Sequence, residues 1–372
     1  MAIDPQDPTH LYQQIAEQIR EQIFSGKLKP DDRIATQNEL AAQYGVSLIT
    51  VKKALAELSS EGIIYSRVGK GTFITATPMR KAQVPHKSIG LVLSDLTTPF
   101  FSLIVQSAEK KTSELGYNLL LKSSSDREEK EETQIAHFQN IGVRGVIIAS
   151  MGHHHQATNG ILQLQEKKFP FIMVSYVQNE DISYIGTDHV YGAQLATEHL
   201  IDLGYKRIGY INSEETDILG QLRQQGYERA LVASGHGVDK DIIFQQPLTN
   251  GKNQFQAGYQ LGLQFAKVDN RPDAIFAFND LTALGFEQSV LSQGLRIPED
   301  VAIVGFDNIE RDLYAPVPLT TVRPPTSTIG ALAVETLVRM INGDQSVTRT
   351  FLKPQLVIRE SCGANKATNN AG

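Results

Sequence analysis

From Ser88 onward, short apolar runs alternate with stretches of helical periodicity. Glycines such as Gly116, Gly142 and Gly204 stand where the helices should end. This alternation predicts repeated β–α units, and therefore parallel sheets with helices on both faces. Because about 270 residues exceed one doubly wound domain, we expect two similar α/β lobes with a cleft between them. The expected strands are 89–93, 117–121, 145–149, 171–174, 207–211, 274–277 and 301–304, and the expected helices are 100–115, 128–141, 193–203, 222–233, 255–265, 281–291 and 327–341.

The first 75 residues carry different signals, those of helices separated by a tight turn. Thr36 and Glu39 form a T-x-x-E capping box, which predicts a helix that runs to about Tyr44 and stops at Gly45. Ser47 is expected to cap the next helix, and an apolar stripe with helical spacing follows it. A further stripe near the N-terminus predicts another helix. The two stripes are Val51, Ala54, Leu55 and Leu58, and Leu11, Ile15, Ile19 and Ile23.

A basic hairpin is expected directly after Gly62, where the helix capped by Ser47 should end. Residues 63–65 and 72–74 are predicted strands, and residues 66–71 join them with cations near the tip. Two helices, a tight turn and a basic wing are typical of a winged helix-turn-helix (α+β), which places the start of its second helix in the major groove of DNA. The alternative is a structural three-helix domain with solvated basic residues. The candidate DNA-binding residues are Thr36, Asn38, Ser47, Leu48, Ile49, Thr50, Lys52, Lys53, Arg67, Gly69 and Lys70.

The charge distribution is compatible with DNA binding although the net charge is −6. Residues 1–80 hold nine cations and nine anions, so the excess of acidic residues lies beyond them. Several cations of this neutral segment stand on the expected groove helix and wing. A local basic face on an acidic protein suits a DNA binder that avoids non-specific contacts.

The composition also indicates where the domains end and in which cellular compartment the protein is expected. Residues 76–87 have two prolines and few apolar side chains, so we expect a linker between a DNA-binding domain (1–75) and an effector-binding and dimerisation domain (88–361), with a tail at 362–372. The one cysteine, Cys362, is expected to be inert near that tail. No apolar run approaches the length of a membrane span, and the N-terminus is not a signal peptide. These features favour the cytoplasm and no membrane association.

Polar side chains follow several expected strands at their carboxyl ends, where open α/β sheets bind ligands. Asp95, Asn279 and Asp307 each follow such a strand, and Phe100 and Phe101 come shortly after Asp95. Aromatic rings beside Asn, Asp and Arg suit a sugar, because rings cover its C–H face and charged groups bind neighbouring hydroxyls. The alternative is that each polar residue merely caps a helix.

Catalytic and metal-binding patterns are weak. The phosphate-binding loops G-x-G-x-x-G and G-x-x-x-x-G-K-[ST] and the nucleophile elbow G-x-S-x-G are missing from the sequence. The three adjacent histidines at 153–155 have poor geometry for one metal ion, and the charge run at 128–132 fits a solvated helix face. We therefore expect no enzyme activity, no metal and no cofactor.

Residues 8–75 resemble the GntR family of bacterial DNA-binding domains. The motifs that carry the resemblance are L-Y-x-Q-I, G-K-L-K-P-D-D-R-I, N-E-L-A, Y-G-V-S, T-V-K-K-A-L, L-x-x-E-G and G-K-G-T-F. Two positions depart from the family pattern. Leu48 stands after Y-G-V-S, where the family commonly has a base-reading Arg, and Asn38 stands where many members have another Arg. Neither Leu48 nor Ile49 can make the bidentate guanine contact of an arginine.

Residues 87–360 resemble the LacI/GalR effector domain, which is similar to the periplasmic sugar-binding proteins. The motifs include S-D-x-x-x-P-F-F, H-L-I-D-L-G-Y-K-R-I-G-Y-I, R-Q-Q-G-Y-x-x-A-L, P-D-A-I-F-A-F-N-D, V-A-I-V-G-F-D-N and P-L-T-T-V-R-P-P. The resemblance implies a homodimer and a hinged cleft that closes on a small ligand. Ser175 and Tyr176 stand where many members have Asp-Arg, and Pro324 where a Gln is frequent. With Asp95 from the strand pattern, the candidate effector-binding residues are Thr98, Phe100, Phe101, Ser175, Tyr176, Arg223, Asn279 and Asp307.

A GntR-type reader joined to a LacI-type sensor is a known pairing among bacterial regulators. We therefore expect a cytoplasmic, dimeric transcription regulator, most simply a repressor that a monosaccharide releases from operator DNA. Two other mechanisms stay open at this point. The ligand could act as a corepressor, or the sensor could act through a protein partner.

Overall fold

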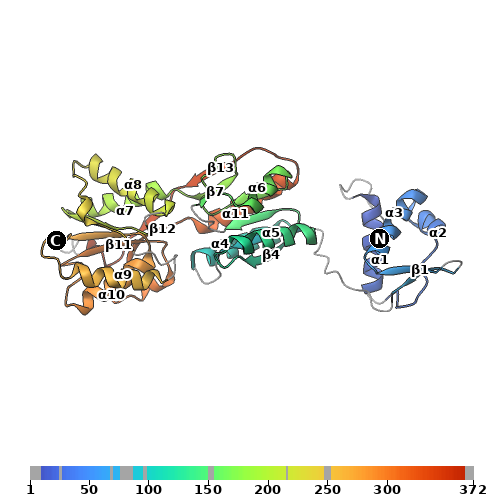
Figure 1. Cartoon of the computed structure of the whole chain (residues 1–372), viewed down its shortest axis with the longest axis horizontal. Coiled ribbons are helices and arrows are strands. Elements are labelled where there is room, and N and C mark those ends of the chain that lie inside the picture. The colour runs from blue at the N-terminus through green and yellow to red at the C-terminus, as the bar shows by residue number, and fades with distance from the viewer. Residues whose placement is uncertain are drawn as a thin grey trace. The chain divides into compact units, whose positions relative to one another are not determined.

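The computed structural model describes residues 10–24, 27–67, 70–75, 87–94, 99–149, 155–214, 217–246 and 253–364 (Figure 1). The chain divides into two compact units, Met1–Gln83 and Val84–Gly372. Most of the expected linker lies outside the described residues. Its last residue, Lys87, belongs to the second unit, because its carbonyl accepts a hydrogen bond from Asn118 N at 2.7 Å.

The first unit is a winged helix-turn-helix. It contains helices α1 (Leu11–Phe24), α2 (Gln37–Tyr44) and α3 (Leu48–Ser60), followed by antiparallel strands β1 (Ile64–Arg67) and β2 (Gly71–Ile74). The predicted capping box is confirmed, since Thr36 N donates to Glu39 Oε2 at 2.6 Å and Glu39 N donates to Thr36 Oγ1 at 3.3 Å. Gly45 ends α2 with φ 65°, the left-handed conformation that glycine adopts without strain.

The core of the first unit is built from the predicted stripes. Ile15, Ile19, Val51 and Leu58 are almost fully buried, and each contributes roughly 1.5–3 kcal/mol by leaving water. Arg20 is also buried, with 2% of its side chain exposed, and its guanidinium is held by three carboxylates. These belong to Glu17 on α1, Glu57 on α3 and Glu61 just after α3.

The second unit consists of two α/β lobes, as the alternating pattern predicted. The sheet of the first lobe has the order β13-β7-β6-β5-β3-β4, with every pairing parallel. Two pairs of helices carry the apolar side chains that cover it, α4 with α11 and α5 with α6. The elements are β3 (Ser88–Leu93), α4 (Pro99–Glu114), β4 (Asn118–Ser123), α5 (Glu128–Ile141), β5 (Val146–Ala149), α6 (Asn159–Glu166), β6 (Phe171–Met173), β7 (Tyr184–Thr187), α11 (Thr326–Ile341) and β13 (Arg349–Leu352).

The second lobe has the sheet order β14-β12-β11-β10-β8-β9, and only β14 runs antiparallel to its neighbour within the described pairings. Helices α7 and α8 belong to one core cluster of this lobe, and α9 and α10 to another. The elements are α7 (His189–Asp202), β8 (Ile208–Ile211), α8 (Ile218–Ala233), the 3₁₀ turn η2 (Lys240–Ile242), β9 (Ile243–Phe244), α9 (Gln254–Phe265), β10 (Ala274–Ala277), α10 (Asp280–Ser292), β11 (Ala302–Phe306), the 3₁₀ turn η3 (Glu310–Leu313), β12 (Thr320–Arg323) and β14 (Gln355–Val357).

The chain passes between the lobes three times, at 187–189, 323–326 and 352–355 (Figure 1). Each lobe is therefore assembled from separate stretches of sequence. The sequence analysis missed α6 and strands β7, β9, β12, β13 and β14, and it placed none of the three crossings.

The expected C-terminal tail needs a correction at its start. Cys362 is fully buried in the core of the second lobe, and its sulfur lies 3.3 Å from His199 Nε2. Tyr205 Oη also donates to the Cys362 carbonyl at 3.0 Å. The packed lobe thus continues past residue 361, because this thiol fills part of its core.

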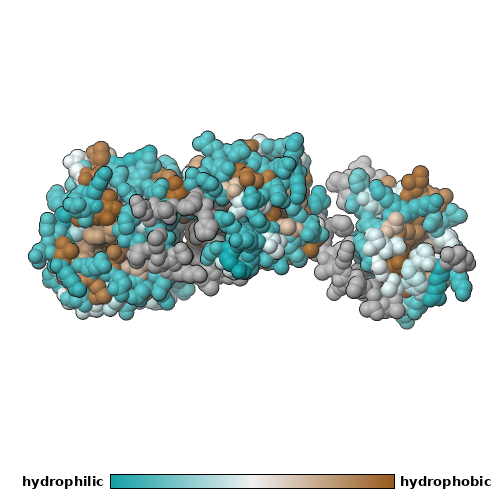
Figure 2. Space-filling view, viewed as in Figure 1, coloured by the Kyte–Doolittle hydropathy of each residue, from teal (hydrophilic) through white to brown (hydrophobic). Residues whose placement is uncertain are grey.

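The visible surface of both units is mostly hydrophilic, with apolar residues in small groups (Figure 2). Among the described helices, none combines the length and the hydropathy that a membrane span requires.

Candidate DNA-binding surface and effector site

The start of α3 carries side chains that the sequence analysis assigned to DNA. Ser47 Oγ accepts from Thr50 N at 3.2 Å, and the two hydroxyl oxygens lie 2.8 Å apart. The Ser47 hydroxyl therefore caps the helix, and the Thr50 hydroxyl is paired with it. Leu48, Ile49 and Lys52 beside them are exposed. This end of the helix is thus open to solvent, as a helix that enters the major groove must be.

Two candidate cations rest on aromatic rings. Lys53 Nζ lies 4.1 Å from the ring centre of Tyr12 on α1. The Arg67 guanidinium lies 5.2 Å from the ring of Tyr65 and 5.5 Å from that of Phe73. Such cation–π contacts hold the two charges at defined positions while leaving them exposed to a phosphate.

The remaining DNA-binding candidates are spread over α2 and the wing. Asn38 and Lys70 are exposed. Thr36 is exposed as well, but its hydroxyl already serves the capping box. Gly69 lies outside the residues that the structure describes.

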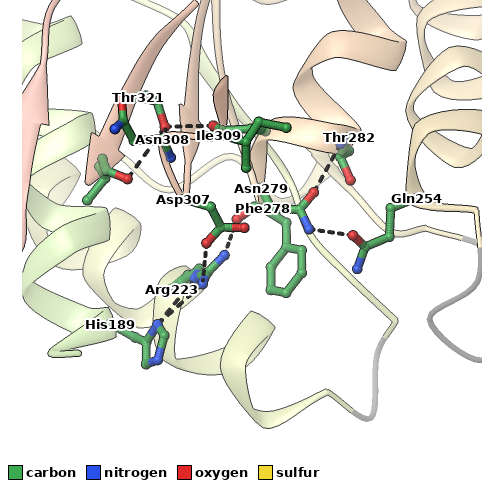
Figure 3. A network of polar contacts seen from close by, with 12 residues as sticks. His189, Arg223, Gln254, Phe278, Asn279, Thr282, Asp307, Asn308, Ile309 and Thr321 are labelled. Carbon is green, nitrogen blue, oxygen red and sulfur yellow. Dashed lines mark hydrogen bonds and ion pairs between the residues drawn. The ribbon is translucent and has the colours of Figure 1, made fainter. Parts of the chain in front are cut away.

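Arg223 lies at the centre of a polar network in the second lobe (Figure 3). It projects from α8 and is buried, and its guanidinium carbon lies 3.7 Å from the ring centre of Phe306 and 4.5 Å from that of Phe278. Its Nη1 donates to the Phe278 carbonyl. Its contacts with His189 Nδ1 at 3.4 Å and Asp307 Oδ1 at 3.7 Å are longer than ordinary hydrogen bonds. Donors of this guanidinium therefore remain available to a ligand.

Close packing of α7 and α8 positions Arg223. A Cβ on Gly226, one turn further along α8, would collide with the backbone oxygen of Val190 on α7. Glycine at this position lets the two helices approach. The approach brings Arg223 beside His189, the first residue of α7. Burial and the nearby guanidinium lower the pKa of His189 well below its usual value, so this ring is neutral and can accept a hydrogen bond.

Asp307 follows β11 directly and faces Arg223 (Figure 3). Its φ of 120° lies outside the range that non-glycine residues adopt comfortably, and such strain is concentrated at functional sites. Burial raises the pKa of Asp307 to about 7, and the pull of Arg223 in the opposite direction is smaller. The carboxyl group can therefore change charge near neutral pH.

Asn279, the cap of α10, has both ends of its side chain occupied. Its Oδ1 accepts from Thr282 N at 3.0 Å, and its Nδ2 donates to Gln254 Oε1 at 2.6 Å. Capping of α10 explains the bond of Oδ1 but not that of Nδ2. The bond to Gln254, the first residue of α9, ties this helix start to the same edge of the sheet (Figure 3).

Two neighbours of the candidates have structural roles. Asp280 is fully buried and accepts from Thr321 Oγ1 at 2.6 Å and from Ile309 N at 3.1 Å. Asn308 accepts from Arg359 Nη2 at 2.7 Å. These bonds fix the loop after β11, and so they hold Asp307 in its strained conformation.

The first-lobe candidates are only partly described. Phe101 is 4% exposed and belongs to the core of that lobe, whereas Phe100 is half-buried, with its ring centre 5.3 Å from that of Phe101. Phe101 is thus placed to support Phe100 rather than to meet a ligand. Asp95 and Thr98 fall outside the described ranges.

Ser175 is buried and Tyr176 is half-buried, and both follow β6. The carbonyl of Tyr176 lies 3.2 Å from His155 Nδ1, and His155 Nε2 lies 3.4 Å from Asp217 Oδ1 in the second lobe. This pair joins the two lobes directly.

The two units match two families. Residues 11–74 match the model of bacterial regulatory proteins of the gntR family, and residues 197–362 match that of the periplasmic binding protein-like domain. Over 366 residues the chain is 31% identical to an arabinose metabolism transcriptional repressor of Geobacillus stearothermophilus, covering 94% of this chain and 97% of that protein.

The chain belongs to the same family of bacterial regulators as this repressor, with a gntR-type domain at residues 11–74 and a periplasmic binding protein-like domain at residues 197–362. It is a transcriptional regulator that joins a gntR-type DNA-binding domain to a periplasmic binding protein-like domain.

Solved structures resemble the sensor of this gntR-family regulator. A LacI-family regulatory protein from Chloroflexus aggregans is 25% identical with a TM-score of 0.67, and it covers 74% of this chain and 98% of its own. A LacI-family regulator from Enterococcus faecium with bound ribose is 27% identical with a TM-score of 0.63, again over 74% and 98% of the two chains. The two-lobed α/β fold expected from the sequence is thereby confirmed.

Sequence reasoning missed four residues of the network in this regulator, namely His155, His189, Asp217 and Gln254. Asp217 and Gln254 each stand at a helix start, a position that the sequence alone could have flagged. His155 entered the sequence analysis only through a rejected metal site. Within the described ranges no three His, Cys, Asp or Glu side chains gather as metal ligands, and His153 and His154 fall outside them.

Proposed function

We propose that this regulator is a cytoplasmic homodimeric repressor that leaves its operator when a monosaccharide binds between the lobes. The observation that carries the proposal is the pairing of Arg223 with Asp307, in which the Arg223 guanidinium lies over the rings of Phe278 and Phe306. A guanidinium and a carboxyl group side by side can bind neighbouring hydroxyls, and the buried rings of Phe278 and Phe306 hold the guanidinium in place by stacking on it.

Two relatives support a small sugar as the effector. The first acts, by its name, in arabinose metabolism, and the second was crystallised with ribose. Both sugars are pentoses, whose hydroxyls are numerous and adjacent. Ser175, Tyr176 and Asn279 complete the proposed effector site, together with Asp95, Thr98 and Phe100.

The proposed mechanism is a shift between two states of the sensor. Sugar favours one lobe arrangement, and in the dimer this arrangement spaces the two reader domains wrongly for the operator. Half-sites should lie about 10 bp or a multiple apart, because two symmetric helices meet the same face of DNA. A coupling of roughly 1–3 kcal/mol, or about 5–150-fold in affinity, is typical of such regulators.

Fluorescence anisotropy of a DNA fragment from upstream of the protein's own gene tests the proposal. We expect tight, salt-sensitive binding that one pentose or hexose of a panel releases. Arg223→Ala should abolish release while the DNA affinity stays unchanged. Arg229→Ala is the matched control, since Arg229 is exposed on the same helix. Release of Arg223→Ala by the same sugar would contradict the assigned site, and stronger binding with sugar would reverse the direction of control.

A further inference from the structure

Two large apolar side chains at the start of α3 are exposed to solvent. Ile49 is 78% exposed and Leu48 45%. At about 100° per residue, Ile49 lies about 160° round the helix from the buried Val51. It therefore projects away from the core, with the exposed Lys52 and Lys53 on either side. In the described part of the first unit no other large apolar side chain is exposed to this degree.

The polar groups near Ile49 are largely occupied. The hydroxyls of Ser47 and Thr50 bond to each other, and Ser47 Oγ also accepts from Thr50 N. Between them these hydroxyls keep at most one hydrogen for another acceptor. Lys53 lies over the ring of Tyr12. The centre of this surface is consequently apolar, while its margin is cationic.

The major groove of DNA presents one apolar group on its base edges, the C5-methyl of thymine. We propose that Ile49 and Leu48 recognise thymine methyl groups, so that each operator half-site contains thymines where the start of α3 enters the groove. This inference rests on the proposed DNA-binding function. Phosphate contacts from Lys52 and Lys53 would position the helix but carry no sequence information.

Uracil substitution tests the inference, because uracil differs from thymine only by that methyl group. The full-length protein first selects its site from duplexes of random sequence, and the selected site is then rebuilt with one thymine at a time replaced by uracil. At one or two thymines per half-site, affinity should fall about fourfold, the effect of burying one methyl-sized group. Uracil at the other thymines should leave the affinity unchanged.

A double-mutant cycle assigns the effect to the side chain. Ile49→Ala should bind the thymine site more weakly and should no longer distinguish uracil from thymine at the sensitive position. The side chain is exposed and alanine favours helices, so this variant should fold. Val232→Ala is the matched control, because Val232 is 66% exposed on α8 of the sensor. It should keep the full discrimination.

The failures of the two proposals are distinguishable. If the protein selects no duplex at low salt, DNA binding itself is wrong. If it selects a site but uracil has no effect anywhere, or if uracil and Ile49→Ala weaken binding independently, methyl recognition is overturned while DNA binding stands.

Discussion

A single carboxyl group, that of Asp307, couples the effector site to pH. Its pKa is raised to about 7 by burial, so the folded protein holds a proton between about pH 4 and pH 7 that the unfolded chain releases. The stability of the sensor therefore falls as pH rises through that window, because the unfolded chain gains free energy by ionising a carboxyl group that stays protonated in the folded protein. Burial and the Arg223 guanidinium lower the pKa of the neighbouring His189 well below its usual value, in the opposite direction to that of Asp307.

We expect sugar affinity to rise between pH 6 and pH 8, since the ionised Asp307 is the better acceptor for sugar hydroxyls. Calorimetric titration at pH 6, 7 and 8 measures this trend once the sugar is known. In Asp307→Asn the trend should vanish. A pH dependence that survives in this variant would point to another group.

Arg20 is a second single residue with a large expected effect, in this case on the stability of the DNA-binding domain. Replacing it with Met leaves Glu61, which is 11% exposed, without its main partner. Because loss of one partner strands a buried charge, we expect a destabilisation of about 2–4 kcal/mol. Hydrogen exchange in α3 should speed up in Arg20→Met and stay unchanged in Lys27→Met, whose side chain is exposed. Equal protection in both variants would show that the ion cluster contributes little.

At the scale of elements, His155 and Asp217 form a direct link between the lobes. Asp217 also caps α8 by accepting from Leu219 N at 2.9 Å, and asparagine can replace it in that role. Asp217→Asn therefore removes the charge alone. A pair this close and partly buried is worth about 1 kcal/mol, or about fivefold in the population of the linked arrangement.

Distances between spin labels would report that population. Leu162 on α6 and Val232 on α8 are exposed sites in different lobes, and the native Cys362 is buried and should resist labelling. We expect Leu162→Cys/Val232→Cys protein to show a broader distance distribution when Asp217→Asn is added. His155→Gln should have the same effect. Unchanged distributions would mean that other contacts hold the lobes.

The elements also show why prediction succeeded in one place and failed in another. The signals for α2 and α3 are local, because Thr36, Gly45 and Ser47 stand next to the helix ends that they define. Strand β13 has no such signal. It is short, its Phe351 is 48% exposed, and its partner β7 lies about 160 residues earlier in the chain. The same reason hid His189, whose role depends on its contact with Arg223 on α8.

At the scale of the whole molecule, the second lobe has a surface suited to self-association. A hollow of about 680 Å³ there is bordered by the exposed Tyr314, and Leu313 beside it is 53% exposed. Exposed apolar groups around a hollow are typical of protein interfaces. The lining residues are Phe255, Leu284, Gln288, Glu310, Arg311, Tyr314, Ala315 and Pro316.

We therefore expect Tyr314→Glu to weaken the proposed dimer at least tenfold, because the charge would be buried in the interface. Sedimentation velocity at several concentrations measures this. Val347→Glu, at a side chain of the first lobe that is 55% exposed, is the control. A Tyr314→Glu protein as dimeric as the control would place the interface elsewhere.

The three crossings between the lobes have a consequence for how the protein is made. Strand β3 leaves the ribosome about 260 residues before β13, which completes the same sheet. At roughly 5–20 residues per second, translation leaves the first lobe unfinished for tens of seconds. The DNA-binding domain forms a compact unit within the first 83 residues, so it can fold during that interval. Each newly made chain would thus hold a folded DNA-binding domain before it has a sensor to control it.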